Sequence, residues 1–250
     1  MTSELDYYTG VFWGPRKETP EELAARLLKL IARLQMIDPI FAHWYTWAPL
    51  QRALPFDTQV APLAEKIEAN VTTDDSGDPE PEIGYQLFAH NTTIKKPGPR
   101  NFEAHMYAGG SSPWLSNMIG IRTDDGVAPD PDVVIYRTCR SALLALAETF
   151  EATIGSAYPT SLIDLWPKDR HWQPRLKLAW ISYVAPGFAP LITPPSSAIV
   201  ERRPDGGLLM AATDETFVTT NPAHVAVARE IEAAAAPFNA LAYPWETGDR

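Results

Sequence analysis

The pattern of apolar and polar positions predicts a strand and then a helix at the start of the chain. In residues 5–13, large apolar side chains occupy both alternating rows, which is typical of a strand buried on both faces. Thr19 then opens a capping box that Glu22 completes, with Pro20 at the first helical position. Pro39 ends the helix. Its apolar stripe consists of Leu23, Leu27, Leu30, Ile31, Leu34 and Ile37.

Alternating residues predict three more strands in the middle of the chain. They cover 83–90, 102–108 and 117–122, and loops rich in Pro, Gly and Ser separate them, which favours an antiparallel meander. The stretch 39–62 is irregular and aromatic. We interpret it as a loop or short helix over the edge of the core, followed by a short helix over 62–69; the alternative is an aromatic patch for a partner.

The next part of the chain predicts a helix and further strands. A helical pattern runs over about 136–153 and would turn Phe150 and Ile154 inward. A strand is expected within 157–166. Apolar residues alternate with polar ones over 176–184, which predicts another strand there.

The last part of the chain predicts a hairpin and a helix. Two strands flank the dipeptide Asp205-Gly206, which is a strong short-range turn signal. Asn221 then caps a helix that reaches about Ala236. His224 lies in its first turn, where we expect a surface position.

These elements follow the order strand, helix, three strands, helix, several strands, helix. Hairpin-like loops between the strands favour an antiparallel or mixed sheet with helices packed against it, which is the α+β class. A chain of 250 residues can bury a full core, and its 24 prolines fall between elements rather than in one linker. We therefore expect residues 1–250 to form a single layered domain.

Composition narrows the partners that the chain can have. It carries 21 Lys and Arg against 31 Asp and Glu, a formal net charge of −10, which argues against nucleic acid or an anionic membrane and favours basic partners. The single cysteine, Cys139, cannot form an internal disulfide. The first residues lack the pattern of a signal peptide, and no apolar run reaches 18 residues. We therefore expect a cytoplasmic protein.

Most of the net charge lies in two short segments, 72–82 and 123–132, neither of which contains Lys or Arg. Without their nine acids, 22 Asp and Glu would face 21 Lys and Arg. Because both segments flank strands of the same meander, we expect them to merge into one negative patch that binds a basic partner. The alternative is that they only maintain solubility. The candidate binding residues are Asp74, Asp75, Asp78, Glu80, Glu82, Asp124, Asp125, Asp130 and Asp132.

The best candidate for catalysis is Glu103-x-His105 with His90 on the preceding strand. Residues i and i+2 of a strand share a face, so the three side chains could form a metal site or an acid–base pair of a small hydrolase. The alternative is a solvated polar face. Cys139 fits a small buried side chain, and 169–171 (Asp-Arg-His) fits a solvated turn. With no nucleotide-binding, hydrolase or zinc-protease motif, we expect no catalytic residue, cofactor or resident metal.

Both ends of the chain resemble one family of bacterial proteins. At the start, Trp13–Arg16 (Trp-Gly-Pro-Arg) and the helical segment 21–27 are similar to the opening of the immunity protein 52 family of polymorphic-toxin systems. Near the end, 179–183 (Ala-Trp-Ile-Ser-Tyr) resembles that family's Gly-Trp-Leu-Thr-Tyr strand, with Ala in place of the first Gly. The segments 204–217 and 221–225 resemble its closing hairpin and helix.

The resemblance implies a non-enzymatic antitoxin that binds and neutralises a cognate toxin domain. Such toxins are often restriction-endonuclease-like nucleases delivered by a type VI secretion system. A nuclease must carry Lys and Arg to hold phosphates, so an acidic inhibitor fits it. The matching residues look structural and locate no toxin contact. A non-catalytic secretion-system adaptor that uses the aromatic segment 41–47 is the remaining alternative, and the sequence indicates no oligomeric state.

Overall fold

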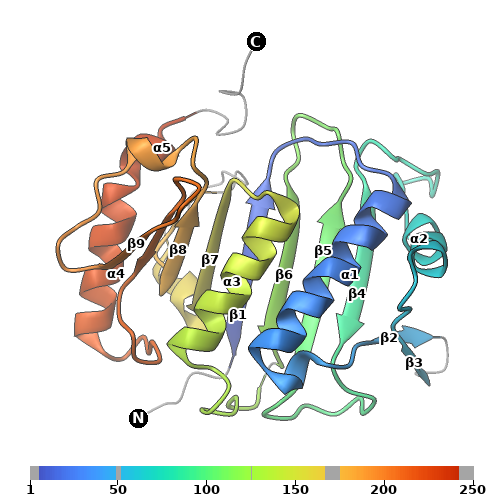
Figure 1. The fold of residues 1–250 in the computed structure, drawn as a ribbon, viewed down its shortest axis with the longest axis horizontal. Coiled ribbons are helices and arrows are strands. Elements are labelled where there is room, and N and C mark those ends of the chain that lie inside the picture. The colour runs from blue at the N-terminus through green and yellow to red at the C-terminus, as the bar shows by residue number, and fades with distance from the viewer. Residues whose placement is uncertain (1–5, 49–51, 125, 167–174, 242–250) are drawn as a thin grey trace.

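The protein is built around one antiparallel sheet of ten strands (Figure 1). The computed structural model describes residues 6–48, 52–124, 126–166 and 175–241. Along the sheet the strands follow the order β3-β2-β4-β5-β6-β1-β7-β8-β10-β9. The strands are β1 (Tyr7–Trp13), β2 (Tyr45–Ala48), β3 (Arg52–Pro55), β4 (Tyr85–His90), β5 (Phe102–Ala108), β6 (Asn117–Thr123), β7 (Ile154–Pro159), β8 (Ile181–Val184), β9 (Ile199–Arg202) and β10 (Leu208–Ala211).

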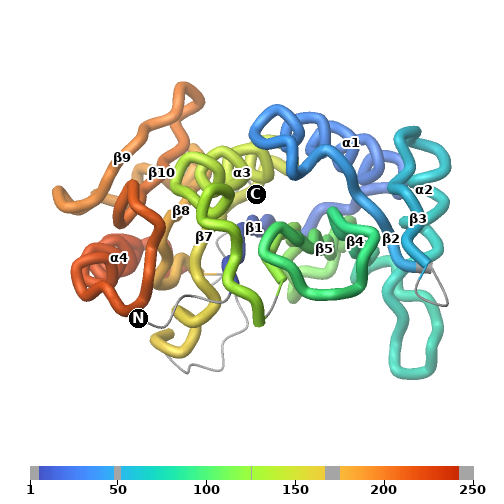
Figure 2. Tube along the Cα trace, turned by 90° about the horizontal axis from the view of Figure 1, so that it is seen from below, coloured from blue at the N-terminus to red at the C-terminus, as the bar shows by residue number. Residues whose placement is uncertain are grey.

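Helices cover the two faces of this sheet unequally. α1 and α3 lie side by side on one face, whereas α4 lies on the opposite face at the β8–β10 end (Figure 2). The helices are α1 (Pro20–Ile37), α2 (Val60–Glu68), α3 (Tyr136–Phe150), α4 (Pro222–Ala234) and α5 (Ala236–Asn239). The α+β class with an antiparallel sheet is therefore confirmed. In the described ranges, no helix combines the length and the apolar character needed to span a bilayer.

The first predicted strand is the centre of the sheet. β1 pairs antiparallel with β6 on one side and with β7 on the other, so both of its edges are hydrogen-bonded. Val11 and Trp13 face the helices, where the ring of Trp13 packs 5.1 Å from that of Phe150 in α3. The opposite row, which includes Tyr8, is also largely buried. The prediction of a strand buried on both faces is confirmed.

α1 begins and ends as its sequence predicts. The Thr19 hydroxyl accepts from the Glu22 backbone N–H, and the Glu22 carboxylate accepts from the Thr19 N–H, which completes the capping box. The helix ends at Ile37, two residues before Pro39. Its leucine stripe is buried against the sheet over β4–β6.

A buried carboxylate ties α1 to the end of α3. Glu18 forms ion pairs with Arg16 (3.1 Å) and Arg26 (2.7 Å). The same two guanidinium groups donate to the last carbonyls of α3, Arg16 to Phe150 O (2.9 Å) and Arg26 to Thr149 O (2.7 Å). Cations at the carboxyl end of a helix satisfy its unpaired carbonyls and complement its dipole. This cluster therefore fixes how α1 and α3 sit on the sheet.

Several predicted boundaries are wrong for identifiable reasons. α3 stops at Phe150 because Glu151 adopts a left-handed conformation (φ 51°), and Ile154 opens β7 instead of extending the helix. The strand expected over 176–184 shortens to β8, because the backbone N–H groups of Leu176 and Leu178 donate to side chains of the C-terminal helices instead of to a neighbouring strand.

Two further predictions are corrected in the aromatic stretch and in the last helix. Residues 39–62 contain the short hairpin β2–β3 as well as a 3₁₀ turn, and each strand is too short to show a period. Phe41 and Trp44 are buried, so the interpretation as a cover over the core edge holds for them. His224 is buried rather than exposed, because its Nδ1 accepts from the Val218 N–H (3.3 Å).

Replacing Glu18 by Ala is predicted to lower the free energy of unfolding by about 2–3 kcal/mol, since two arginines lose their shared buried carboxylate. Urea denaturation measures the change. Glu21→Ala is the matched control, because Glu21 is exposed in the first turn of the same helix, and it should change stability by less than about 0.5 kcal/mol. Equal effects of the two substitutions would contradict the role given to the Glu18 cluster.

Candidate partner-binding surface

The two acidic segments lie at opposite ends of the strands β4–β6. The first precedes β4, whose first residue Tyr85 pairs with Ala108 at the end of β5. The second follows β6, whose last residue Thr123 pairs with Phe102 at the start of β5. β5 spans seven residues, so the two segments at its ends lie roughly 20 Å apart. The prediction of one merged patch is wrong. In a three-stranded antiparallel meander, the start of the first strand and the end of the third strand lie at opposite ends of the middle strand.

The first segment, 72–82, forms a small hairpin that we call the acidic hairpin. Its two sides meet at a bridge between Thr73 and Pro79. The Asp74 carboxylate builds the turn, since its Oδ1 accepts from the backbone N–H groups of Ser76 (2.8 Å) and Asp78 (2.9 Å). Asp74 is therefore partly engaged within the hairpin itself.

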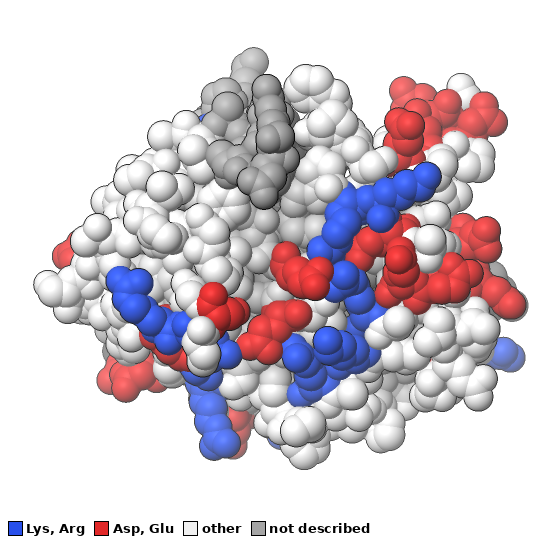
Figure 3. All heavy atoms as spheres, turned by 45° about the horizontal axis from the view of Figure 1, so that its top comes forward, with Lys and Arg blue, Asp and Glu red and all other residues white. Residues whose placement is uncertain are grey.

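The other four acids of this hairpin are exposed or half-buried. Asp75, Asp78 and Glu82 are exposed and Glu80 is half-buried. Figure 3 shows acidic side chains gathered on the side of the molecule that carries α2. In the described part of the chain, no Lys or Arg lies within ion-pair distance of these four carboxylates, so their charge is available to a basic partner.

Two acids of the second segment, Asp124 and Asp130, are instead bonded to other parts of the fold. Asp124 Oδ2 accepts from the Gly98 N–H (3.2 Å) and from Asn101 Nδ2 (2.8 Å). Asp130 pairs with Arg100 at 2.8 Å, and its other oxygen accepts from the Asp132 N–H. These bonds hold the loops at the lower edge of the sheet together. Asp132 is exposed, and Asp125 lies outside the described residues.

The candidate catalytic residues share a face of the sheet, as the spacing predicts, but other groups engage them. His90 lies opposite Glu103 in the β4–β5 ladder. Glu103 pairs with Arg122 (3.3 Å), and the ring of His105 stacks on Tyr8 with centroids 5.8 Å apart. Burial lowers the pKa of both histidines. Within the described ranges, no three His, Cys, Asp or Glu side chains form a group that could hold a metal ion.

The remaining reactive candidates give no site either. Cys139 is buried in α3, and burial raises the pKa of its thiol to about 12, so the thiol stays protonated at neutral pH. The segment 169–171 lies outside the described residues. The interpretation of Cys139 as a small buried side chain is confirmed.

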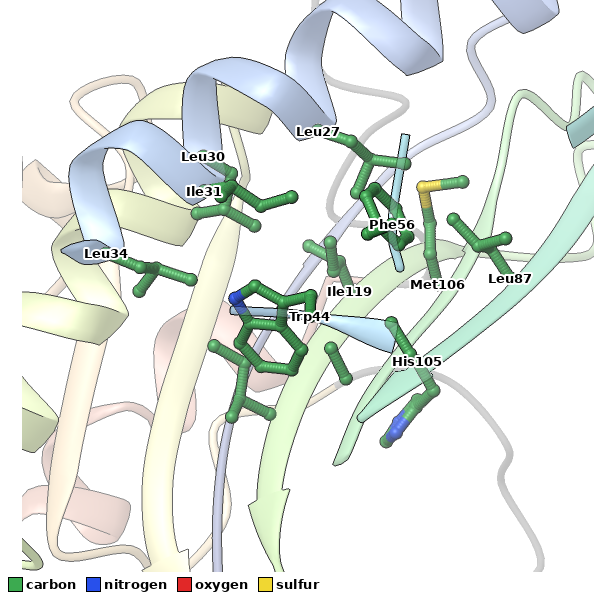
Figure 4. A pocket seen from close by; sticks show the side chains of 13 residues that line it. Leu27, Leu30, Ile31, Leu34, Trp44, Phe56, Leu87, His105, Met106 and Ile119 are labelled. Carbon is green, nitrogen blue, oxygen red and sulfur yellow. The ribbon is translucent and has the colours of Figure 1, made fainter. Parts of the chain in front are cut away.

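A cavity of about 30 Å³ lies between α1 and the sheet. Leu27, Leu30 and Leu34 of α1 line it from above, and strand residues such as Ile119 line it from below (Figure 4). The ring of His105 points away from it, toward the opposite face of the sheet (Figure 4). Because its lining is apolar and its volume is about that of one water molecule, it is a gap in the core packing rather than a ligand site.

Comparison with known families identifies the kind of protein that carries this surface. A family model described as Immunity protein 52 matches residues 5–237. The chain belongs to the immunity protein 52 family. Among solved structures, the Pseudomonas aeruginosa T6SS protein PA0821 matches with a TM-score of 0.54 and 14% sequence identity, covering 92% of this chain and 73% of that chain, which shows a shared fold. The comparison with curated proteins returns no match.

The segments that resemble immunity protein 52 sequences have structural roles. Trp13 packs on Phe150, as described above, and Trp180 donates from Nε1 to Thr213 O (3.0 Å). Asp205 closes the predicted β9–β10 hairpin by accepting from the Gly207 N–H. These residues therefore maintain the fold, and their contacts locate no partner site.

Removing a carboxylate that accepts hydrogen bonds within the fold should affect stability more than removing one that is exposed to solvent. Asp124→Ala is expected to lower the free energy of unfolding by about 1–3 kcal/mol, since Gly98 and Asn101 lose an ionised acceptor. Asp75→Ala should leave it within about 0.5 kcal/mol of the wild type. Thermal or urea denaturation of the two variants tests this, and equal stability losses would contradict the division between the two acidic segments.

Proposed function

We propose that this chain is an immunity protein that neutralises a cognate toxin domain by stoichiometric protein–protein contact, without catalysis or cofactor. The match of the immunity protein 52 model to residues 5–237 carries this proposal. The similarity in fold to a T6SS protein is consistent with a toxin delivered by a type VI secretion system. We further propose that residues 1–250 act as one domain in the cytoplasm of the producing cell.

The toxin that fits this protein best is a nuclease. A nuclease domain carries Lys and Arg where it holds phosphates, and the net charge of −10 complements such a surface. The exposed carboxylates of the acidic hairpin supply local complementarity. Complementary fields raise the association rate, which matters for an inhibitor that must capture its toxin before the toxin reaches nucleic acid. Complexes of enzymes with protein inhibitors bury about 1,600 Å² in total.

The two alternatives have less support. A metal-dependent hydrolase would need the side chains of Glu103 and His105 to be available, yet the first pairs with Arg122 and the second stacks on an aromatic ring. An adaptor that binds through the aromatic stretch would need exposed rings, yet Phe41 and Trp44 are buried.

Reversing the charge of the acidic hairpin should slow toxin capture. In the variant Asp75→Lys, Asp78→Lys and Glu82→Lys, we expect the association rate constant to fall about tenfold or more at low salt, with a smaller difference at high salt because ions screen the field. Stopped-flow association with the cognate toxin domain, which we expect the adjacent gene to encode and which is inactivated by mutation, measures this. Co-expression with the active toxin measures protection of the cells.

The matched control carries the same change of net charge at the other end of the molecule. Asp164, Asp214 and Glu215 are exposed there, and their replacement by Lys should slow association much less. Equal rates for the two triple variants would contradict the role of the hairpin and leave only an effect of total charge. A wild-type pair that fails to associate at low salt would contradict the immunity function itself.

A further inference from the structure

The face of β4, β5 and β6 that points away from α1 is not covered by a helix of the described residues (Figure 2). Along each strand, successive side chains point to opposite faces of the sheet. Met106 and Ile119 point toward α1, whereas Phe88, His105 and Tyr107 point to the opposite side. A solvated sheet face is ordinarily polar, so these rings need a physical reason for their position.

The rings on this side form one continuous cluster, which we call the aromatic face: Tyr8, Phe88, His105 and Tyr107. Phe88 and Tyr107 meet edge to face with centroids 5.9 Å apart, and each lies about as close to His105 (6.5 and 6.4 Å). His105 stacks in turn on Tyr8. Phe88 is 43% exposed and Tyr107 38% exposed, so the outer half of the cluster meets solvent.

Two glycines let this cluster lie flat on the sheet. A Cβ at Gly10 would come within 2.1 Å of the Tyr8 hydroxyl oxygen, and one at Gly120 would come within 2.6 Å of the Tyr8 ring. Tyr8 therefore lies along the sheet surface, over positions that carry no side chain, and supports His105. The exposed rings thus rest on a rigid base, which lowers the entropy cost of binding through them.

The acidic hairpin stands beside the aromatic face. It leads into β4 and projects past the sheet on the side opposite to α1 (Figure 2). The Glu82 carbonyl accepts from the N–H groups of Ser111 and Ser112, which joins the hairpin to the loop between β5 and β6. That loop carries Trp114, which is 77% exposed, and the exposed Leu115. Aromatic, apolar and acidic groups therefore meet at the upper edge of this face.

We propose that the aromatic face is the docking surface for a basic segment of the toxin, whose Lys or Arg side chains stack on Phe88 and Tyr107 next to the acidic hairpin. This inference rests on the proposed function. Cations bind the faces of aromatic rings, and carboxylates nearby strengthen their attraction to the site. Aromatic residues on a rigid support are also typical of the positions that dominate binding energy in interfaces.

Charge selects this occupant over a second copy of the chain. In a two-fold dimer formed through this face, each copy would contribute the same surface, so both partners would bring an acidic hairpin and a net charge of −10. These like charges would repel each other, which slows the association of two copies. A basic partner meets the rings and the carboxylates at once without this repulsion.

The test compares three double variants in binding to the same inactivated toxin domain. Phe88→Leu with Tyr107→Leu keeps apolar area but removes both rings, and we expect the dissociation constant to rise about tenfold or more, mainly through faster dissociation. Phe88→Tyr with Tyr107→Phe keeps both rings and should bind within about threefold of the wild type. Ile199→Ala with Val200→Ala, at similarly exposed positions on β9, is the control and should not change binding.

Three outcomes would overturn the inference. If the leucine variant bound as tightly as the wild-type chain, the aromatic face would not be the docking surface, while the immunity function would stand. If both leucine and control variants lost affinity equally, the effect would be non-specific. If light scattering showed that the chain alone forms dimers that the leucine variant loses, the face would be an interface between copies. Failure of the wild-type chain to bind the toxin would instead contradict the proposed function.

Discussion

The position of α1 and α3 on the same face of the sheet is the constraint from which the other features follow. The Glu18 cluster holds the start of α1 against the last carbonyls of α3, so the two helices cover that face side by side. α4 covers the opposite face only near β8 and β10. Over β4–β6 no helix of the described ranges covers the opposite face, so the rings of Phe88 and Tyr107, which pack on each other and on His105, remain partly exposed.

Charged groups divide into those that build the fold and those that remain available to a partner. Arginines between α1, α3 and the β9–β10 hairpin are paired with glutamates, as the contacts of Arg33 and Arg203 with Glu148 show. Asp124 and Asp130, which follow β6, bond to neighbouring loops. The acidic hairpin differs, since its exposed carboxylates have no cation beside them in the described structure. Exposed negative charge thus lies next to the aromatic face, which is where the proposed docking of a basic protein would use it.

Local signals predicted the elements, while their arrangement needed the tertiary structure. The capping box of Thr19 and the Asp205-Gly206 turn are complete within a few residues, so the sequence located α1 and the β9–β10 hairpin. The burial of His224 depends on a backbone N–H six residues earlier, and the β2–β3 hairpin is too short to show a period. For the candidate site, the sequence identified the two acidic segments but did not show that they lie at opposite ends of the strands β4–β6. Nor did it single out Phe88 and Tyr107, although their alternation with apolar residues in two adjacent strands was a usable signal.

We propose that this protein acts by binding its toxin and carries out no chemistry of its own. Titrating the purified active toxin domain with increasing amounts of the chain, and measuring the residual toxin activity, tests it most directly. Binding predicts a linear loss of toxin activity that is complete at one chain per toxin. Separating the two proteins should restore the toxin activity. Complete loss at a small fraction of that ratio, with a toxin that stays inactive or chemically altered after separation, would contradict the account.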